Sequence, residues 1–101
     1  MLRKIKMKKI SKNYQFTLVL KNADEETPHL EDSLFEAGCN DALINFRNDV
    51  VYLNFDREAC SLEQAVLSAI KNVESASVGA KVSNVIHVKQ MMKTEILEHL
   101  D

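Results

Sequence analysis

The side chains that could do chemistry are few and scattered along this 101-residue chain. Three histidines, His29, His87 and His99, stand too far apart to supply the closely spaced ligands of a typical zinc site. The run Asp56–Glu58 gathers two acids and an arginine, and such carboxylates could act as a general acid or base. More often, a short charged run of this kind lies in a solvated turn before a helix. We therefore expect no metal site and an exposed charged turn.

Two cysteines, Cys39 and Cys60, lack the CxxC spacing of zinc and redox motifs. Small thiols often fill space in a core, so we expect both to be buried, with a disulfide as the less favoured alternative. The sequence has no glycine-rich phosphate loop, nucleophile elbow or Ser–His–Asp constellation. It has no apolar run long enough for a secretory signal or a membrane span. These patterns favour a cytoplasmic protein that is not an enzyme and binds no cofactor.

The formal net charge of −2 conceals an uneven distribution of charged residues. The first twelve residues contain six basic side chains and no acid, whereas all fifteen acids follow Asn13. Such an arm can bind nucleic-acid phosphates or an acidic partner, although a solvated terminus is the simpler interpretation. Met7 is an alternative start that would remove half of this charge. The candidate nucleic-acid contacts are Arg3, Lys4, Lys6, Lys8, Lys9 and Lys12.

The elements that must position these residues can be predicted from periodicity and from turn residues. With 46% hydrophobic and 28% charged residues, the chain has the composition of one soluble domain. Residues 14–20 alternate apolar and polar side chains, which predicts a strand. Thr27 and Pro28 predict the start of a helix, and Gly38 predicts its end. The inner face of the strand would carry Tyr14, Phe16, Leu18 and Leu20.

A hairpin is predicted where Asn48 and Asp49 can form a two-residue turn. With that turn, one face of the hairpin pairs Ala42 with Phe55, Ile44 with Leu53 and Phe46 with Val51. The opposite face pairs Leu43 with Asn54, Asn45 with Tyr52 and Arg47 with Val50. Sliding the register by one residue would bury Asn45 and Arg47, so the apolar pattern selects this pairing.

The last third of the chain predicts a helix, a short strand and a tail. Ser61 and Gln64 form a capping-box pattern ahead of apolar residues at helical spacing. Alternation from Val78 predicts a strand that ends near Val85, and the spacing after it favours an amphipathic helix. Together these patterns divide the chain into a basic arm (1–13), a folded domain (14–86) and a C-terminal helix (87–101).

The order strand, helix, strand, strand, helix, strand predicts an α+β, ferredoxin-like βαββαβ sandwich with antiparallel sheet order 4-1-3-2, plus a C-terminal helix. Two helices would cover one sheet face, and the other face would be open unless the tail, the arm or a second subunit covers it. Only Tyr52 offers an aromatic ring there, which favours a protein interface over an RNA platform. The candidate interface comprises Val19, Leu43, Asn45, Arg47, Val50 and Tyr52 on the sheet, with Met91 and Met92 on the tail.

Four passages carry a resemblance to a known family: YQFTLVL, LFEAGCNDALINF, VYLNFDREACSLEQAVLSAIKNV and GAKVSNV. Residues 14–85 resemble the N-terminal domain of a family of small bacterial proteins in which this domain precedes a helix-turn-helix. Members of that family are commonly labelled DNA-binding or antitoxin-like. Here only VIHVKQMMKTEILEHLD follows, which is too short for a helix-turn-helix.

The sequence and the resemblance together favour a bacterial or phage protein that acts through protein contacts, as a homodimer or with another protein. The resemblance implies a regulatory or antitoxin-like role. Two alternatives stay open: nucleic-acid binding through the basic arm and the open face, and an ACT-like domain that binds a small ligand. The identity of the partner is not encoded in any motif.

Overall fold

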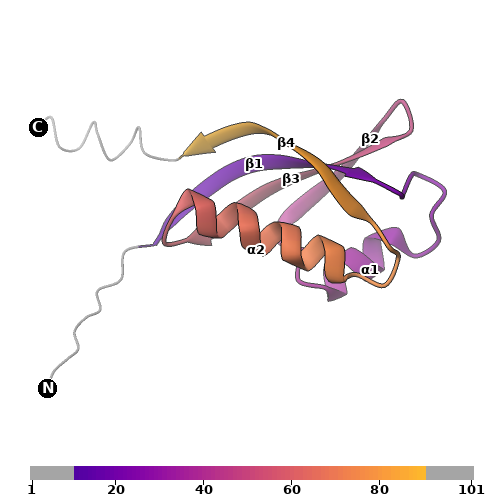
Figure 1. Cartoon of the computed structure of the whole chain (residues 1–101), viewed down its shortest axis with the longest axis horizontal. Helices are drawn as coiled ribbons and strands as arrows, with labels where there is room; N and C mark the ends of the chain where they lie inside the picture. The colour runs from indigo at the N-terminus through magenta and orange to yellow at the C-terminus, as the bar shows by residue number, and fades with distance from the viewer. Residues whose placement is uncertain (1–10, 91–101) are drawn as a thin grey trace, which may run out of the picture.

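The structure is a computed structural model that describes residues 11–90. Its elements are, in order, β1 (Lys12–Lys21), α1 (Leu30–Glu36), β2 (Ala42–Arg47), β3 (Val50–Ala59), α2 (Leu62–Ser75) and β4 (Lys81–Gln90). The four strands form one antiparallel sheet with the order β2-β3-β1-β4, and both helices lie on the same side of it (Figure 1). This is the predicted order 4-1-3-2 counted from the other edge, so the α+β class and the strand order are confirmed.

The core lies between the sheet and the two helices. The inner side chains of β1, from Tyr14 to Leu20 at every second position, are all buried, as the period-two pattern predicts. Phe16 of β1 stacks on Phe55 of β3, with ring centroids 5.3 Å apart and ring planes 10° from parallel. On α2, Ala65, Ala69 and Val73 face this layer and are fully buried.

The β2–β3 hairpin has the predicted register at every pair from Ala42–Phe55 to Arg47–Val50. Asn48 and Asp49 both have positive φ, 51° and 68°, as a type I′ turn requires. Val51, Leu53 and Phe55 are buried, whereas their partners on the edge strand β2 are only partly buried. The predicted turn, the predicted register and the predicted assignment of side chains to the two faces are therefore confirmed.

The start of α1 differs from the prediction. The helix begins at Leu30 after His29, whose φ is 59° and whose side chain makes no capping hydrogen bond. Thr27 is not the N-cap because its hydroxyl is used within the preceding loop, where it accepts a hydrogen bond of 2.9 Å from the Asp24 backbone N–H. At the other end, Gly38 has a φ of +112°, and the N–H groups of Gly38 and Cys39 donate to the carbonyls of Phe35 and Leu34. This is a Schellman C-cap, as the glycine predicts.

The start of α2 follows its sequence signal closely. The Gln64 backbone N–H donates to Ser61 Oγ at 3.0 Å, which confirms Ser61 as the N-cap. The Gln64 side chain accepts a hydrogen bond of 3.0 Å from the N–H of Cys60, one residue before the N-cap. The capping box is thus closed by the residue preceding the cap, and α2 runs on to Ser75.

The last strand corrects the predicted tail. β4 begins at Lys81 and continues to Gln90, so residues 87–90, assigned above to the C-terminal helix, lie in a strand instead. The physical reason is the length of β1, which offers backbone partners as far as the Tyr14–Gln90 pair. The two strands stay paired through two register shifts, one between Gln15 and Thr17 and one between Val19 and Leu20. Residues 91–101, with Met91 and Met92, and residues 1–10 of the arm lie outside the described residues.

Candidate functional site

The sheet face opposite the helices, called the open face below, is built from the outward positions of all four strands. Strand pairing places side chains in rows that cross the sheet. One row is Asn45, Tyr52, Val19 and Asn84, and the next is Leu43, Asn54, Thr17 and Ile86. All six sheet residues of the candidate interface are brought to this face, as alternation predicts. Among residues 11–90, Leu43 is the most exposed large apolar side chain, at 74%.

Two contacts organise the centre of the open face. The guanidinium carbon of Arg47 lies 5.0 Å from the ring centroid of Tyr52, so the arginine covers one side of the ring. Thr17, which is buried, donates its hydroxyl to Asn54 Oδ1 at 2.9 Å. The first contact links β2 to β3 and the second links β1 to β3. Both hold side chains in place before any partner binds.

The strand β4 adds residues that sequence reasoning missed. Lys81, Asn84, Ile86 and Lys89 pair with outward positions of β1 and so share the open face. His87 has a φ of 53° at a register shift and lines the same hollow as Lys89. The hollow has a volume of about 460 Å³. The only sequence signal for this longer strand was the apolar run of Val85, Ile86 and Val88, which also fits a helix.

Charge is distributed unequally between the two sides of the sheet. Among residues 12–90, the open-face positions carry four lysine or arginine side chains (Lys21, Arg47, Lys81 and Lys89) and two acids (Asp56 and Glu58). The helices on the other side carry five acids and one lysine: Glu31, Asp32, Glu36, Glu63, Glu74 and Lys71. The part of the chain that follows Asn13 holds all fifteen acids, yet the strand positions of its open face carry an excess of positive charge.

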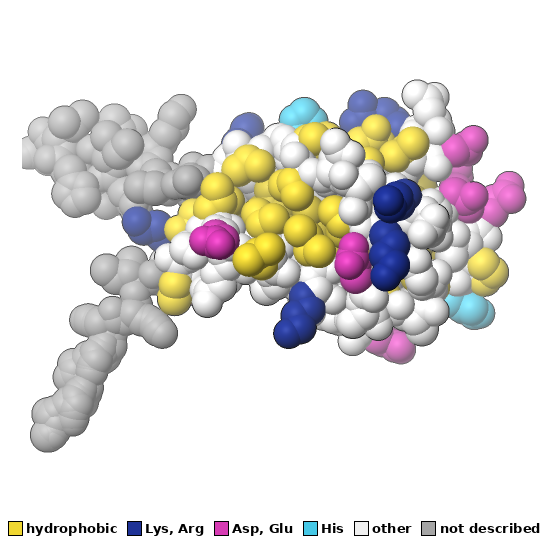
Figure 2. All heavy atoms as spheres, in the orientation of Figure 1, with side chains coloured by type: hydrophobic (Ala, Val, Ile, Leu, Met, Phe, Trp, Pro, Cys, Tyr) yellow, Lys and Arg dark blue, Asp and Glu magenta, His cyan; other side chains and the backbone are white. Residues whose placement is uncertain are grey.

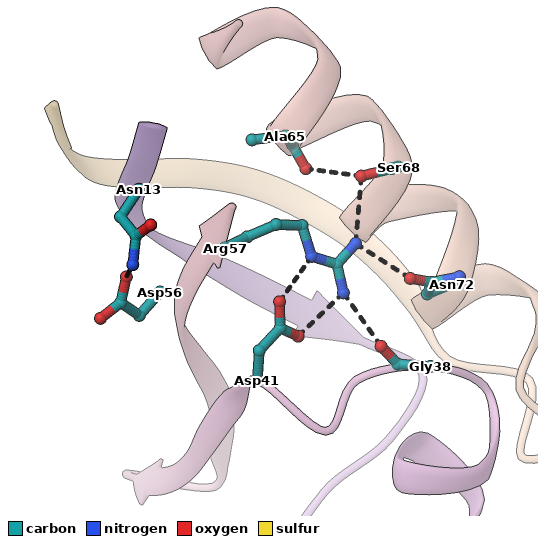
Figure 3. Close-up of polar contacts among 8 residues, drawn as sticks. All are labelled: Asn13, Gly38, Asp41, Asp56, Arg57, Ala65, Ser68 and Asn72. Atoms are coloured by element: carbon teal, nitrogen blue, oxygen red, sulfur yellow. Dashed lines mark hydrogen bonds and ion pairs between the residues drawn. The ribbon is translucent and has the colours of Figure 1, made fainter. Parts of the chain in front are cut away.

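A second polar cluster lies on the inner face of the sheet, centred on Arg57 (Figure 3). The prediction that the run Asp56–Glu58 forms an exposed turn is wrong, because β3 continues through these residues to Ala59 and turns Arg57 inward. The guanidinium makes a two-point ion pair with Asp41, with Nε–Oδ2 and Nη2–Oδ1 distances of 2.7 and 2.9 Å. It also donates to the side chains of Ser68 and Asn72 and to the carbonyl of Gly38.

These five hydrogen bonds use all five N–H groups of Arg57. Its guanidinium also lies over the Phe55 ring, 5.0 Å from the centroid. The hydrogen bond to Asp41 raises the pKa of Arg57 above its ordinary value, so the side chain is always charged. A group whose donors are all satisfied by the fold has none left for a substrate. The cluster ties β3 to α2 and to the α1–β2 connection, and we assign it a structural role.

The two cysteines differ from each other in their environment. Cys39 is buried, as expected, whereas Cys60 is exposed after β3, which corrects its prediction as a core residue; both are free thiols. Burial raises the pKa of Cys39 from 9.0 to about 11, and the nearby charge of Arg57 opposes this shift only in part.

The raised pKa of Cys39 predicts a loss of stability at high pH. The folded state holds the thiol proton more tightly than the unfolded state, so its contribution is complete below pH 9 and is lost as the pH rises towards about 11. Urea unfolding of the full chain and of Cys39→Ala at several pH values measures this effect. We expect the free energy of unfolding to fall more steeply between these pH values in the native chain than in the variant. Parallel pH profiles would contradict the prediction.

The remaining chemistry-bearing residues do not converge on a site. Of the histidines, His29 lies exposed at the start of α1, His87 lies on the open face, and His99 lies outside the described residues. Within residues 11–90, no group of three or more His, Cys, Asp or Glu side chains is arranged to hold a metal ion. In the same range, no helix is long and apolar enough to cross a membrane.

A second hollow, of about 440 Å³, lies between α1 and β2. Leu34, Phe35 and Ile44 line it, and Leu43 lines both this hollow and the one on the open face. Leu43 is therefore the side chain best placed to report on binding at this side of the sheet.

No family model, curated protein or solved structure matches the chain.

Proposed function

We propose that this chain is a non-enzymatic, ferredoxin-like domain that acts through protein contacts on its open face. The element order and the strand order β2-β3-β1-β4 support the fold assignment. The position of both helices on one side supports the assignment of the surface, since no other element of residues 11–90 covers the opposite side (Figure 1). A regulatory, antitoxin-like role in a bacterium or phage stays the prediction that the resemblance carries.

The observation that carries this proposal is the mixture of side chains on the open face. Leu43 is 74% exposed, and the central Tyr52 is only partly buried. Around them lie Val19 and Val50, also partly buried, and the amides of Asn45, Asn54 and Asn84. A central aromatic residue with scattered apolar and polar neighbours is typical of a non-obligate protein interface.

Leu43 provides the direct test of this interface. A photo-cross-linking amino acid at position 43 of the full chain, expressed in host cells, should capture a discrete protein, whereas one at position 67 should not. Leu67 is the matched control because it is an exposed leucine, at 57%, on α2 and therefore on the other side of the sheet. The captured protein is then purified, and its affinity for the native chain, Leu43→Asp and Leu67→Asp is measured by calorimetry.

We expect Leu43→Asp to weaken binding by at least about tenfold, as for an apolar side chain that becomes buried on binding, and Leu67→Asp to have no effect. Equal cross-linking at both positions, or affinity that does not depend on Leu43, would show that the open face is not the interface. The homodimer expected from the sequence is a separate proposal, which light scattering of the full chain over a range of concentrations tests directly.

Direct nucleic-acid binding is a second candidate, favoured by the cations that β4 adds to the open face. Lys81 and Lys89 extend the positive charge of Lys21 and Arg47 across the sheet. This function requires an affinity for oligonucleotides that falls steeply with salt and is lost when residues 1–12 are deleted. Binding that survives that deletion would exclude a role for the basic arm.

A further inference from the structure

We infer that the open face binds an acidic segment of a different protein, with Arg47 as a carboxylate-binding residue held in position by Tyr52. The inference rests on the proposed role of the open face as a protein interface and specifies the chemistry of its partner. It follows from three observations: the excess of positive charge on the face, the position of the Arg47 guanidinium, and the partial covering of the Tyr52 ring by Arg47.

The charge of the open face indicates which charge its partner must carry. Its strand positions among residues 12–90 carry four cations and two anions, an excess of two positive charges. Two copies stacked face to face would bring these excess charges together, which is unfavourable. A different protein that presents aspartate or glutamate side chains is electrostatically complementary.

The positive charge is also ordered along one row of the sheet. Arg47 pairs with Val50, and Lys21 pairs with Lys81 one residue beyond the Leu20–Val51 pair. This row therefore crosses all four strands, which spans roughly 14 Å at the ordinary strand spacing. A segment that crosses the strands with two or three carboxylates can contact the whole row.

Arg47 is arranged to bind a carboxylate rather than only to attract one. Its guanidinium lies over Tyr52, 5.0 Å from the ring centroid, so stacking on the ring restrains the side chain before a partner arrives. Within residues 11–90, its N–H groups donate to no other group. A planar guanidinium with free N–H groups can accept a carboxylate in a two-point geometry that lysine cannot reproduce. Arg57 makes this contact with Asp41 inside the same molecule.

The aromatic ring favours a protein partner over single-stranded nucleic acid. Sequence-tolerant binding of single strands depends on aromatic faces on which bases stack. Tyr52 is the only Phe, Tyr or Trp side chain among the outward positions of the four strands, and Arg47 covers one side of it. The apolar side chains beside it, Leu43, Val19 and Ile86, fit a protein surface and have no role in binding phosphates.

The test measures the affinity of the full chain for a fluorescent glutamate-rich peptide by anisotropy, with the glutamine version of the peptide and a fluorescent oligothymidylate as comparison probes. We expect the glutamate peptide to bind more tightly than both. Arg47→Gln should weaken its binding roughly tenfold, the effect of losing a hydrogen-bonded charge, and Arg47→Lys should restore little of it. Lys71→Gln on α2 removes one positive charge from the other side of the sheet and should leave the affinity unchanged.

The outcomes separate this inference from the proposed function. If Arg47→Gln has no effect but Leu43→Ser weakens binding of the peptide, the open face is an interface in which Arg47 does not bind carboxylates, and only the inference fails. If neither variant changes the affinity, both fail. Tighter binding of oligothymidylate would make nucleic acid the occupant and overturn both. Unchanged urea midpoints for the variants show that they are folded.

Discussion

Replacement of Arg57 by methionine is expected to lower the free energy of unfolding by about 3 kcal/mol, the lower end of the range for breaking a buried ion pair. Methionine keeps the apolar contact with Phe55 but removes five hydrogen bonds at once. Asp41 is then left as a charge without its partner. Because the Asp41 side chain is 30% exposed, water can hydrate it in part, which keeps the loss near the lower limit. For a domain of this size, that is a large fraction of the total stability.

The matched control for this prediction is Arg47→Met, the same change at the arginine of the open face. Arg47 is exposed and contacts one tyrosine ring, so its removal should cost less than about 1 kcal/mol. Urea unfolding of both variants, followed by far-ultraviolet circular dichroism, measures the two losses under identical conditions. Similar losses for the two arginines would mean that the Arg57 cluster contributes no more to stability than a surface contact.

Replacement of Gly38 by alanine is the second change with a large expected effect, a loss of about 2–4 kcal/mol. Gly38 has a φ of +112°, which side chains with a Cβ rarely adopt, and this backbone strain accounts for the first 1–2 kcal/mol. In addition, a Cβ at this position would lie 3.0 Å from the amide of Asn72. Asn72 cannot move away freely because its Oδ1 accepts a hydrogen bond of 2.9 Å from Arg57. The substitution therefore disturbs the Arg57 cluster as well as the helix end.

The variant Gly79→Ala separates the cost of backbone strain from the cost of the contact with Asn72. Gly79 also has a positive φ, +78°, but a Cβ there would meet no atom within 4 Å. It should cost only the backbone part, about 1–2 kcal/mol. The difference between the two glycine variants in urea unfolding reports on the contact with Asn72, and it should shrink when both are measured in an Asn72→Ala background. A difference that persists there would place its cause elsewhere.

Features of this protein that depend on neighbours in the chain could be predicted from the sequence. The Asn48–Asp49 turn and the alternation on either side of it specify the hairpin, because any other register would bury polar side chains. Ser61 and Gln64 specify the start of α2 through hydrogen bonds within one helical turn. From these elements the order of the strands follows by simple rules of connection. The six candidate interface residues on the sheet were assigned correctly to one face for the same reason.

Features that depend on distant segments were decided only by the tertiary structure. Arg57 is buried because Gly38, Asp41, Ser68 and Asn72, contributed by two other parts of the chain, together satisfy its donors; its sequence neighbours Asp56 and Glu58 suggest only an exposed turn. The length of β4 was decided by β1, whose backbone pairs with it as far as Gln90. That pairing brings His87 and Lys89 to the open face, and Lys89 adds to its positive charge. The sequence alone determined which side chains of the hairpin and of β1 point away from the core, and only the folded sheet determined which residues of β4 join them, because strand pairing joins residues that no local pattern relates.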